Sequence, residues 1–272
     1  MAIVKRTGCE ANRRSPAAGK SYRNGSIDAD GTGDVEFQKT AFIQGWAALL
    51  TGPGGGLVGL GAAIEESAID AGQRRRLTPY GRIAFRCALG LTMRGDAAGV
   101  VFCSQHGDTH LTLELLQTQV TGELLSPTGF ALSVHNAVAG LLDIGRQSHT
   151  GHVAISAGSQ TLSAGMVEAL LRLSERPDIP QLVLDLDMPP ALGYPSDART
   201  PDVSGFALRL STVHTPDSLG QVTRSNNSDG APDSGVTSRD LISMLAAYLD
   251  GKTGTPGIGW VAQGSKWKIS IY

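Results

Sequence analysis

The sequence predicts an α/β fold in which a layered sheet of mixed direction is flanked by helices. Two observations lead to this class. Apolar runs of strand length alternate with stretches of helical spacing from residue 42 onwards, and the stretch from Ser126 to Leu171 contains a helix, a strand, a sharp turn and a buried helix in succession. Because helices separate only some of the predicted strands, we expect both parallel and antiparallel neighbours in the sheet.

The composition is that of an ordinary globular protein without a general attraction to polyanions or membranes. The 272 residues are 41% hydrophobic and 18% charged, and the formal net charge is −2. No apolar run approaches the roughly 18 residues that span a bilayer, and no signal-peptide pattern opens the chain. We therefore expect a cytoplasmic protein that binds no nucleic acid and does not cross a membrane.

Composition also divides the chain into three segments. Residues 1–39 are polar and bury too little apolar surface to offset their ordering entropy, so we expect a disordered N-terminal extension. Residues 40–213 contain the main series of strands and helices. Residues 214–272 begin with a run of Ser, Asn, Asp, Gly and Pro, which predicts a mobile loop over 216–237, and continue with a helix and C-terminal strands packed on the same domain.

The first predicted strand, Phe42–Leu50, leads into a glycine-rich segment. Gly54, Gly56 and Gly59 fit the G-x-G-x-x-G pattern of a dinucleotide-binding turn. The sequence that follows lacks both the expected helix and a second strand ending in an acidic residue. A flexible glycine loop is therefore favoured over a nucleotide-binding turn.

A helix is predicted to begin at Thr78 and Pro79, because threonine caps helix N-termini and proline suits the first helical position. Arg74, Arg75 and Arg76 lie directly before it. A solvated basic loop is the favoured interpretation of these arginines, and a contact for an acidic partner is the alternative.

The other elements outside the central stretch follow the same two patterns. They are strands at 98–104, 181–187 and 203–213, helices at 111–120 and 238–249, and a terminal strand pair or extended tail at 260–272. The clean alternation of 203–213 indicates the strand that closes the sheet.

Residue types that ligate metals are present but not clustered. The three cysteines are too irregularly spaced for a disulfide framework or a metal motif, and Cys103 is expected to be a buried small apolar residue. Asp185 and Asp187 share one face of their strand, which allows a divalent-metal site. Because no further ligand accompanies them in the sequence, a strand end emerging into solvent is favoured. We expect no metal and no cofactor.

The central stretch begins with a predicted helix whose apolar face includes Phe130, Val134 and Val138. His135 and Asn136 are interpreted as side chains that satisfy buried backbone groups where this helix crosses another element. A strand at 152–157, a turn at 158–161 and a second helix follow. A short residue at such a turn lies at a helix N-terminus, which favours a developing anion, and enzymes that acylate a side chain place their nucleophile there.

Four segments resemble one known family, the β-ketoacyl synthase-like N-terminal domains of the thiolase superfamily. They are SVHNAVAGLLDI, the turn AISAGSQT, the helix SAGMVEALL and RRRLTPYGRIAF, and the resemblance extends over residues 42–213. It implies a thiolase-like layered sheet that forms essentially one half of the full thiolase fold. It also puts Ser159, with Gln160 as its neighbour, at the position of the condensing cysteine of true 3-oxoacyl-[acyl-carrier-protein] synthases.

The resemblance implies a role without condensation. The thiol is replaced, and the histidine pair that the second half of a condensing enzyme supplies has no obvious counterpart. This pattern is similar to chain-length factors, which are inactive alone and form a heterodimer with a ketosynthase to shape the acyl tunnel. The implied context is aryl polyene, polyketide or fatty-acid-like chain synthesis. Phe130, Val134, His135 and Asn136 would lie at the tunnel or the interface.

The same resemblance implies that the three consecutive arginines, 74–76, contact an acyl carrier protein. Two other functions remain open. Ser159 could be the nucleophile of an acyltransferase or thioesterase with His135 or His106 as base, although the G-x-S-x-G elbow is absent. The chain could also be a self-associated scaffold without lipid chemistry.

Overall fold

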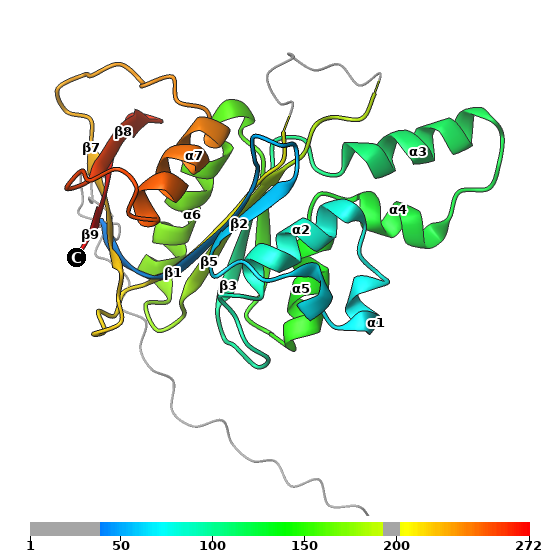
Figure 1. The fold of residues 1–272 in the computed structure, drawn as a ribbon, viewed down its shortest axis with the longest axis horizontal. Coiled ribbons are helices and arrows are strands. Elements are labelled where there is room, and N and C mark those ends of the chain that lie inside the picture. Colours follow the sequence, from blue (N-terminus) through cyan, green and yellow to red (C-terminus); the bar gives the residue numbers. More distant parts are fainter. Residues whose placement is uncertain (1–38, 193–201) are drawn as a thin grey trace, which may run out of the picture. The chain divides into compact units, whose positions relative to one another are not determined.

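A mixed sheet of nine strands organises the described part of the chain (Figure 1). The computed structural model describes residues 39–192 and 202–272. The strands are β1 (Thr40–Thr51), β2 (Leu57–Gly61), β3 (Gly99–Cys103), β4 (His152–Ile155), β5 (Gln181–Asp187), β6 (Ser204–Ser211), β7 (Gly220–Asn226), β8 (Ile258–Ala262) and β9 (Ser265–Ile271). The helices are α1 (Ala71–Arg74), α2 (Pro79–Ala88), α3 (Thr109–Val120), α4 (Pro127–Ser133), α5 (Ala137–Arg146), α6 (Thr161–Glu175) and α7 (Ser238–Leu249), with short 3₁₀ turns η1 (Glu66–Ala68) and η2 (Gly158–Gln160).

The sheet contains strands of both directions, which confirms the predicted α/β class. Its order is β4-β3-β5-β6-β1-β7-β9-β8, with β2 paired to β1. β3 runs parallel to both β4 and β5, and the pairings from β5 through β6, β1, β7 and β9 to β8 are antiparallel. Every residue of β3 and β5 is buried, as the apolar sequence of β3 predicts for a parallel strand covered on both faces; in β5 the burial includes Gln181, Asp185 and Asp187.

Helices on the two faces of the sheet create two hydrophobic cores (Figure 1). Successive side chains of a strand point to opposite faces, so Val101 of β3 joins the core formed with α6 and α7, and Phe102 joins the core formed with α2 and α5. We call these the α6 face and the α5 face of the sheet.

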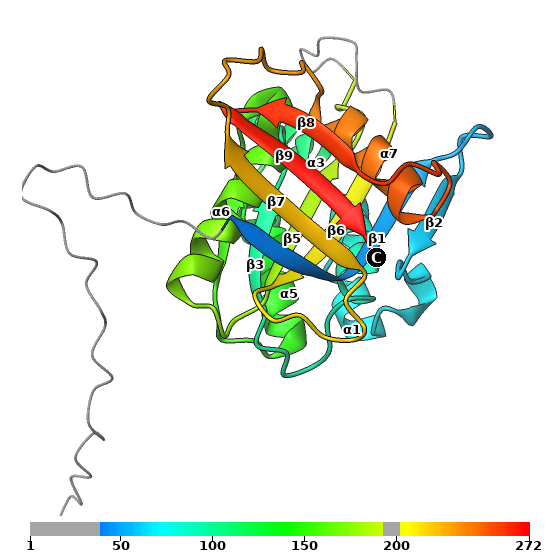
Figure 2. The same ribbon diagram turned by 90° about the vertical axis from the view of Figure 1, so that its left-hand side faces the viewer.

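Beyond β1, the sheet continues into β7, β9 and β8 (Figure 2). Inner side chains of these three strands complete the core on the α6 face. Trp260 and Trp267 stack there with their ring centroids 5.7 Å apart and their planes at 5°. The indole N–H of Trp260 donates a hydrogen bond to Ser163 Oγ of α6 over 3.3 Å. The terminal strand pair predicted at 260–272 is thus the β8–β9 hairpin, and it is part of the core.

Two helices are capped at their N-termini, and the capping of α2 is the one predicted from the sequence. Thr78 Oγ1 accepts a hydrogen bond from the backbone N–H of Gly81 at the start of α2, and Pro79 is the first residue of that helix. In α7, Thr237 and Asp240 form a reciprocal capping box. Both helices therefore begin where the sequence places them.

The helix predicted through Phe130 and Val138 is wrong as one element, because it is broken in two. α4 ends at Ser133 and α5 begins at Ala137, while Val134 has an extended backbone with a ψ angle of 144°. The physical reason is tertiary: His135, in the break, donates a hydrogen bond from Nε2 to the carbonyl of Ser104 over 2.9 Å. The two parts of the apolar pattern also have different environments, because Val138 of α5 is buried whereas Phe130 of α4 and Val134 are exposed.

The segment predicted as a mobile loop over 216–237 is also different, because it contains β7. Its polar sequence has little strand propensity. Pairing with β1 on one side and with β9 on the other satisfies its backbone groups, and Val222 is fully buried. Residues 214–272 thus contribute three strands and α7 to the same sheet and core.

The glycine-rich segment joins β1 to β2 in an antiparallel hairpin. Gly55 takes a positive φ of 77° in the tip, and a Cβ on Gly61 would meet the carbonyl oxygen of Trp46 at 2.6 Å. The glycines therefore shape a hairpin and do not open a helix N-terminus, as a dinucleotide-binding turn requires.

The expectation of a disordered extension over 1–39 lies, apart from Lys39, outside the described residues. Within the described ranges, no helix is long and apolar enough to cross a bilayer.

Candidate functional site

The predicted strand, turn and helix of the central stretch are present as β4, η2 and α6. Gly158 takes a positive φ of 57°, which allows the sharp change of direction. Thr161 Oγ1 accepts a hydrogen bond from the N–H of Ala157 over 3.0 Å and donates one to the carbonyl of Gly158 over 2.6 Å. The side chain of Thr161 therefore connects the two ends of the turn by hydrogen bonds.

Ser159 is exposed at this turn. At the N-terminus of α6 beside it, however, one backbone N–H group already has a hydrogen-bond partner. Ser238, the first residue of α7, accepts a hydrogen bond at Oγ from the N–H of Leu162 over 2.8 Å. The same hydroxyl donates to the carbonyl of Ser159 over 3.1 Å. One of the free N–H groups that could stabilise an oxyanion is consequently used within the fold.

Of the two histidines considered as bases, His135 contacts the loop that follows β3, and His106 belongs to that loop. His135 donates from Nε2 to the carbonyl of Ser104, and its ring centroid lies 5.8 Å from that of Phe102. The backbone N–H of His106 donates to Asp187 Oδ1 over 3.3 Å. In the described part of the chain, no hydrogen bond joins His135 to Ser159 Oγ, so the pair lacks the contact of an activated serine.

Asn136 stands at the N-terminal end of α5 but does not cap it. Its side chain makes no cap hydrogen bond at the start of α5, and the residue is exposed. The expectation that side chains at this position satisfy backbone groups at a crossing therefore fits His135 and not Asn136.

The interpretation of Asp185 and Asp187 as a strand end in solvent is wrong. Asp187 is 7% exposed and accepts hydrogen bonds from Ser104 Oγ and from the N–H groups of Gln105 and His106. It is therefore the anchor of the loop after β3. Burial raises the pKa of Asp187, while these hydrogen bonds act in the opposite direction.

Asp185 is 1% exposed, and neither carboxyl oxygen has a hydrogen-bond partner among the described residues. Burial, followed by the neighbouring charge of Asp187, raises the pKa of Asp185 well above its usual range. The reason for the burial is that β5 is an inner strand, with α6 packed over the face that both aspartates share. No group of three metal-ligating side chains occurs in the described ranges.

Cys103 is fully buried opposite Asp185 in the sheet. Burial, with the charges of Asp185 and Asp187, raises the pKa of this thiol well above its usual range. Its Sγ also lies where a Cβ on Gly165 of α6 would be, at 2.1 Å. The expectation of a small buried residue is in accord with this environment, which disfavours a reactive thiolate.

Phe130 and Val134 lie on the surface, 61% and 47% exposed. They belong to a projecting pair of helices, α3 and α4, with its connecting loop (Figure 1). Leu116, Val120 and Leu124 are exposed on the same unit, and we call these five residues the α3–α4 apolar patch. β4, the outermost strand on one side of the sheet, has a free edge in the described structure.

The three consecutive arginines do not act as one group. Arg74 donates from Nη1 to the carbonyl of Glu66 over 3.4 Å, and Arg75 is exposed. Arg76 lines a cavity of about 590 Å³ between α1, α2 and α5. Sequence analysis missed this cavity because its walls come from segments that are distant in the chain.

Comparison with known proteins finds a family match over most of the chain. The family model described as "Beta-ketoacyl synthase, N-terminal domain" matches residues 53–268. The match extends past the limit of 213 suggested by the resemblance in the sequence, and it includes β7, α7 and β8. No curated protein matches the chain.

Several solved structures share the fold. A ketosynthase (ApeO) in complex with its chain length factor (ApeC) from Xenorhabdus doucetiae has a chain that is 24% identical, with a TM-score of 0.63 over 85% of this chain and 99% of that chain. The ishigamide ketosynthase/chain length factor is 12% identical, with a TM-score of 0.56 over 86% and 99%. A type II PKS acyl-carrier protein in complex with its ketosynthase bound to the hexaketide is 12% identical, with a TM-score of 0.58 over 86% and 100%.

These structures show a thiolase-like fold of the ketosynthase kind, and the family match covers most of the chain. The chain belongs to the β-ketoacyl synthase N-terminal domain family.

Proposed function

We propose that the chain is a chain-length-factor-type subunit, catalytically inactive by itself, which pairs with an active ketosynthase and shapes its acyl tunnel. The observation that carries this proposal is a complete strand–turn–helix at the nucleophile position with Ser159 in place of a thiol. The pathways proposed are polyene, polyketide or fatty-acid-like chain synthesis.

The chemistry of condensation supports an inactive subunit. A Claisen-type condensation needs a thiolate that accepts the acyl chain and histidines that stabilise the enolate. Cys103, the cysteine on the neighbouring strand, is fully buried and its pKa is raised, so it cannot supply the thiolate. His135 already donates a hydrogen bond to a backbone carbonyl.

The surface supports a protein partner. An exposed apolar patch on a projecting helix pair is a common feature of protein interfaces, and a free sheet edge can accept a strand from another chain. The α3–α4 apolar patch and the edge strand β4 supply both features. The structural neighbours include two ketosynthases with chain length factors, which suggests a ketosynthase as the partner. Phe130, Val134, His135 and Asn136 are proposed to contribute to the interface or to the acyl tunnel beside it.

An acyl carrier protein is proposed as a second, weaker partner. Arg75 and Arg76 make no ion pair within the described structure, so their charge is available to an acidic surface. One structural neighbour is a complex of a carrier protein with its ketosynthase.

The test is co-expression with a ketosynthase from the same genome, followed by size exclusion with light scattering. The expected result is a one-to-one complex that Phe130→Asp disrupts, because a charge would be buried in the interface. Val213→Asp, which adds the same charge at a 58% exposed site in the segment after β6, is the matched control. A monomer or homodimer in the presence of the ketosynthase contradicts the proposal, and so does condensation of acyl and malonyl carrier thioesters by the isolated chain.

The alternative of a Ser159-dependent acyltransferase or thioesterase has one observation in its favour, the exposure of Ser159 at the start of α6. Its weakness is the absence of a hydrogen-bonded base at His135. Labelling of Ser159 by a fluorophosphonate in the ketosynthase complex, lost in Ser159→Ala, would support this function over the first.

A further inference from the structure

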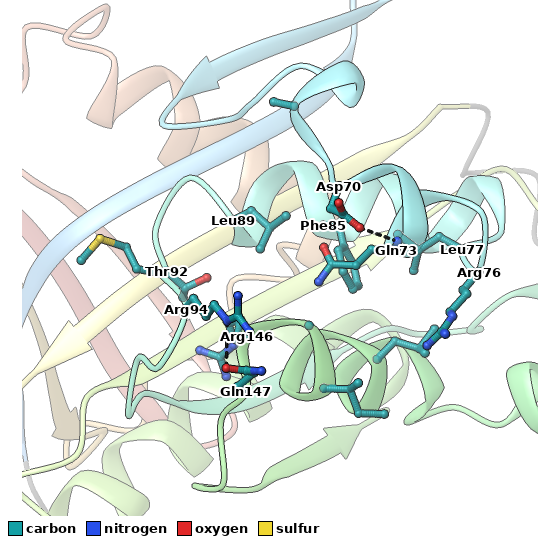
Figure 3. A pocket seen from close by; sticks show the side chains of 15 residues that line it. Asp70, Gln73, Arg76, Leu77, Phe85, Leu89, Thr92, Arg94, Arg146 and Gln147 are labelled. Atoms are coloured by element: carbon teal, nitrogen blue, oxygen red, sulfur yellow. Dashed lines mark hydrogen bonds between the residues drawn. The ribbon is translucent and has the colours of Figure 1, made fainter.

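A cavity on the α5 face of the sheet is separate from the turn at Ser159, which lies at the start of α6 on the other face. It measures about 590 Å³ and is bounded by α1, α2, α5 and the segment after α2 (Figure 3). This volume is within the range of roughly 300–1,000 Å³ that small-molecule sites occupy. The family resemblance does not account for it.

The walls of the cavity are mainly apolar. Apolar side chains lining it are Leu77, Phe85, Leu89, Met93, Leu141 and Ile144. Met93 and Ile144 are 79% and 68% exposed, so the cavity opens to solvent beside them. A ligand that fits these walls carries an apolar body.

Three arginines line the same cavity, with Arg94 and Arg146 beside Gln147 on one side and Arg76 on the other (Figure 3). Arg94 donates from Nε to Gln147 Oε1 over 2.8 Å. Neither Arg76 nor Arg94 has a carboxylate partner in the described residues. Two guanidinium groups of the cavity are therefore outside any direct ion pair of the described structure.

Arg146 is the stronger indication of a ligand, because it is 1% exposed and incompletely bonded. Its Nη2 donates to Asp143 Oδ1 over 2.7 Å and to the carbonyl of Ala98 over 3.2 Å. Nε and Nη1 are buried and have no partner in the described structure. Buried donors without partners are costly, and an acceptor that reached them from the cavity would relieve that cost.

The acidic groups of the cavity limit the charge that it can accept. Asp143 balances Arg146, and Asp70 is the single carboxylate among the lining residues. Asp70 Oδ1 accepts hydrogen bonds from the N–H groups of Gly72 and Gln73 at the start of α1. Arg76 and Arg94 thus face one opposing charge, which favours a ligand with a single negative charge over a phosphate dianion.

We propose that this cavity binds a small carboxylic acid with an apolar aliphatic or aromatic body. The carboxylate lies beside Arg94 and Arg146, and the body lies against Leu77, Phe85 and Leu141. Guanidinium groups bind carboxylates through charge-assisted hydrogen bonds, and the apolar walls exclude water from the remainder of the ligand.

The test is calorimetric titration of the full chain with octanoate below its micelle-forming concentration. Octanol is the control for the carboxylate, because it has the same apolar body without a charge. Octylamine tests the sign of the charge, and inorganic phosphate tests the need for the apolar body. We expect saturable binding of octanoate, with at least about tenfold weaker binding of each control, since octanol and octylamine lack the charge-assisted hydrogen bonds of a carboxylate and phosphate lacks the apolar body.

Arg94→Ala is expected to weaken octanoate binding by about tenfold. Arg75→Ala, which removes an exposed arginine that does not line the cavity, is the matched control and leaves binding unchanged. Ile144→Asp places a negative charge at the opening and should abolish binding. Equal affinity for octanol and octanoate, equal effects of Arg94→Ala and Arg75→Ala, or no saturable binding would overturn the proposal.

Phe130→Asp separates this site from the proposed subunit interface. We expect this variant to lose the ketosynthase and retain octanoate. If octanoate binding is instead lost in Phe130→Asp and retained in Ile144→Asp, the ligand binds at the α3–α4 apolar patch and the cavity is not its site.

Discussion

Two aspartates of β5 differ in their hydrogen bonding: one has several partners, and the other has none among the described residues. Asp187 holds the loop after β3 through Ser104, Gln105 and His106. Asp185, two residues earlier on the same face, has no such partners and is fully buried. A carboxyl in that position is stable when protonated and costly when ionised.

Asp185 therefore makes the stability of the protein depend on pH. Its folded-state pKa is raised above the unfolded value of about 3.9, so its contribution is fully present below that pH and is lost as pH rises through the folded pKa. We expect Asp185→Asn to remove a decline of up to about 1.4 kcal/mol per pH unit above pH 4. Urea denaturation between pH 4.5 and 8 measures how the free energy of unfolding changes with pH in the two proteins. The exposed Asp178→Asn is the control, and an unchanged pH slope in Asp185→Asn would disprove the assignment.

Ser159 allows a second prediction at this scale. Ser159→Cys would create an exposed thiol at the start of α6 without a hydrogen-bonded histidine. We expect iodoacetamide to alkylate this thiol, while condensation of carrier thioesters remains undetectable, because the enolate would have no stabilising group. Ser156→Cys, at another exposed serine just before the turn, controls for general thiol reactivity. Measurable condensation by Ser159→Cys would show that the missing thiol was the sole defect.

At the scale of elements, the contact of α6 with β3 depends on a glycine. Gly165 admits Cys103 Sγ, which lies 2.1 Å from the position of a Cβ. Gly140 of α5 has its nearest neighbour, His152, at 3.7 Å, an ordinary van der Waals distance. Two helical glycines thus differ in whether the space beside them is filled.

Gly165→Ala should consequently destabilise the protein by about 1–3 kcal/mol, because the added methyl group overpacks the helix against the sheet. Thermal or urea unfolding measures this change. Gly140→Ala is the control and should be neutral or slightly stabilising, since alanine has the higher helix propensity. Adding Cys103→Ala to Gly165→Ala should restore part of the loss; a double variant no more stable than expected from the two single changes would contradict the contact.

Sequence analysis was most accurate for elements with their own local signals. Three such signals were sufficient to place their elements. They are the proline and threonine at the start of α2, the apolar residues Leu182–Leu184 of β5 and the turn before α6. It was wrong where partners from distant segments decide the structure. The hydrogen bond from His135 to Ser104 breaks a periodic helix, and pairing with β1 and β9 makes a strand of the polar sequence of β7.

The candidate site was predicted to a similar extent. The position of Ser159 at the start of a helix followed from the alternation and spacing around it, and the structure shows this arrangement. The contact of Ser238 with that helix, the burial of Asp185 and the cavity beside Arg146 could not be predicted, because each joins residues that are far apart in the chain.

At the scale of the whole molecule, one core joins the first strands to the last. The core on the α6 face includes Val101 of β3, Leu241 of α7, and Trp260 and Trp267 of the terminal hairpin. Removing a side chain from that hairpin should therefore weaken the sheet as a whole and not its edge alone.

We expect Trp260→Ala to lower the free energy of unfolding by about 3–5 kcal/mol, the typical cost of a large aromatic side chain in a core. Unfolding followed by far-UV circular dichroism and by tryptophan fluorescence should remain one coincident transition. Leu124→Ala, at a side chain 98% exposed, is the control and should change stability by less than about 0.5 kcal/mol. Two separate transitions would show that the β7–β9–β8 part folds on its own.

The pairing of β1 has a consequence for synthesis of the protein on the ribosome. Of the described strands β1 emerges first, but its residue Phe42 pairs with Ser211 of β6 and Gln221 of β7, which emerge much later. At about 5–20 residues per second, a nascent chain waits on the order of ten seconds or more with its central strand unpaired on those sides. Among the described strands, β2 is the one that β1 can pair with early, so this hairpin protects part of an apolar strand from neighbouring nascent chains while the rest is translated.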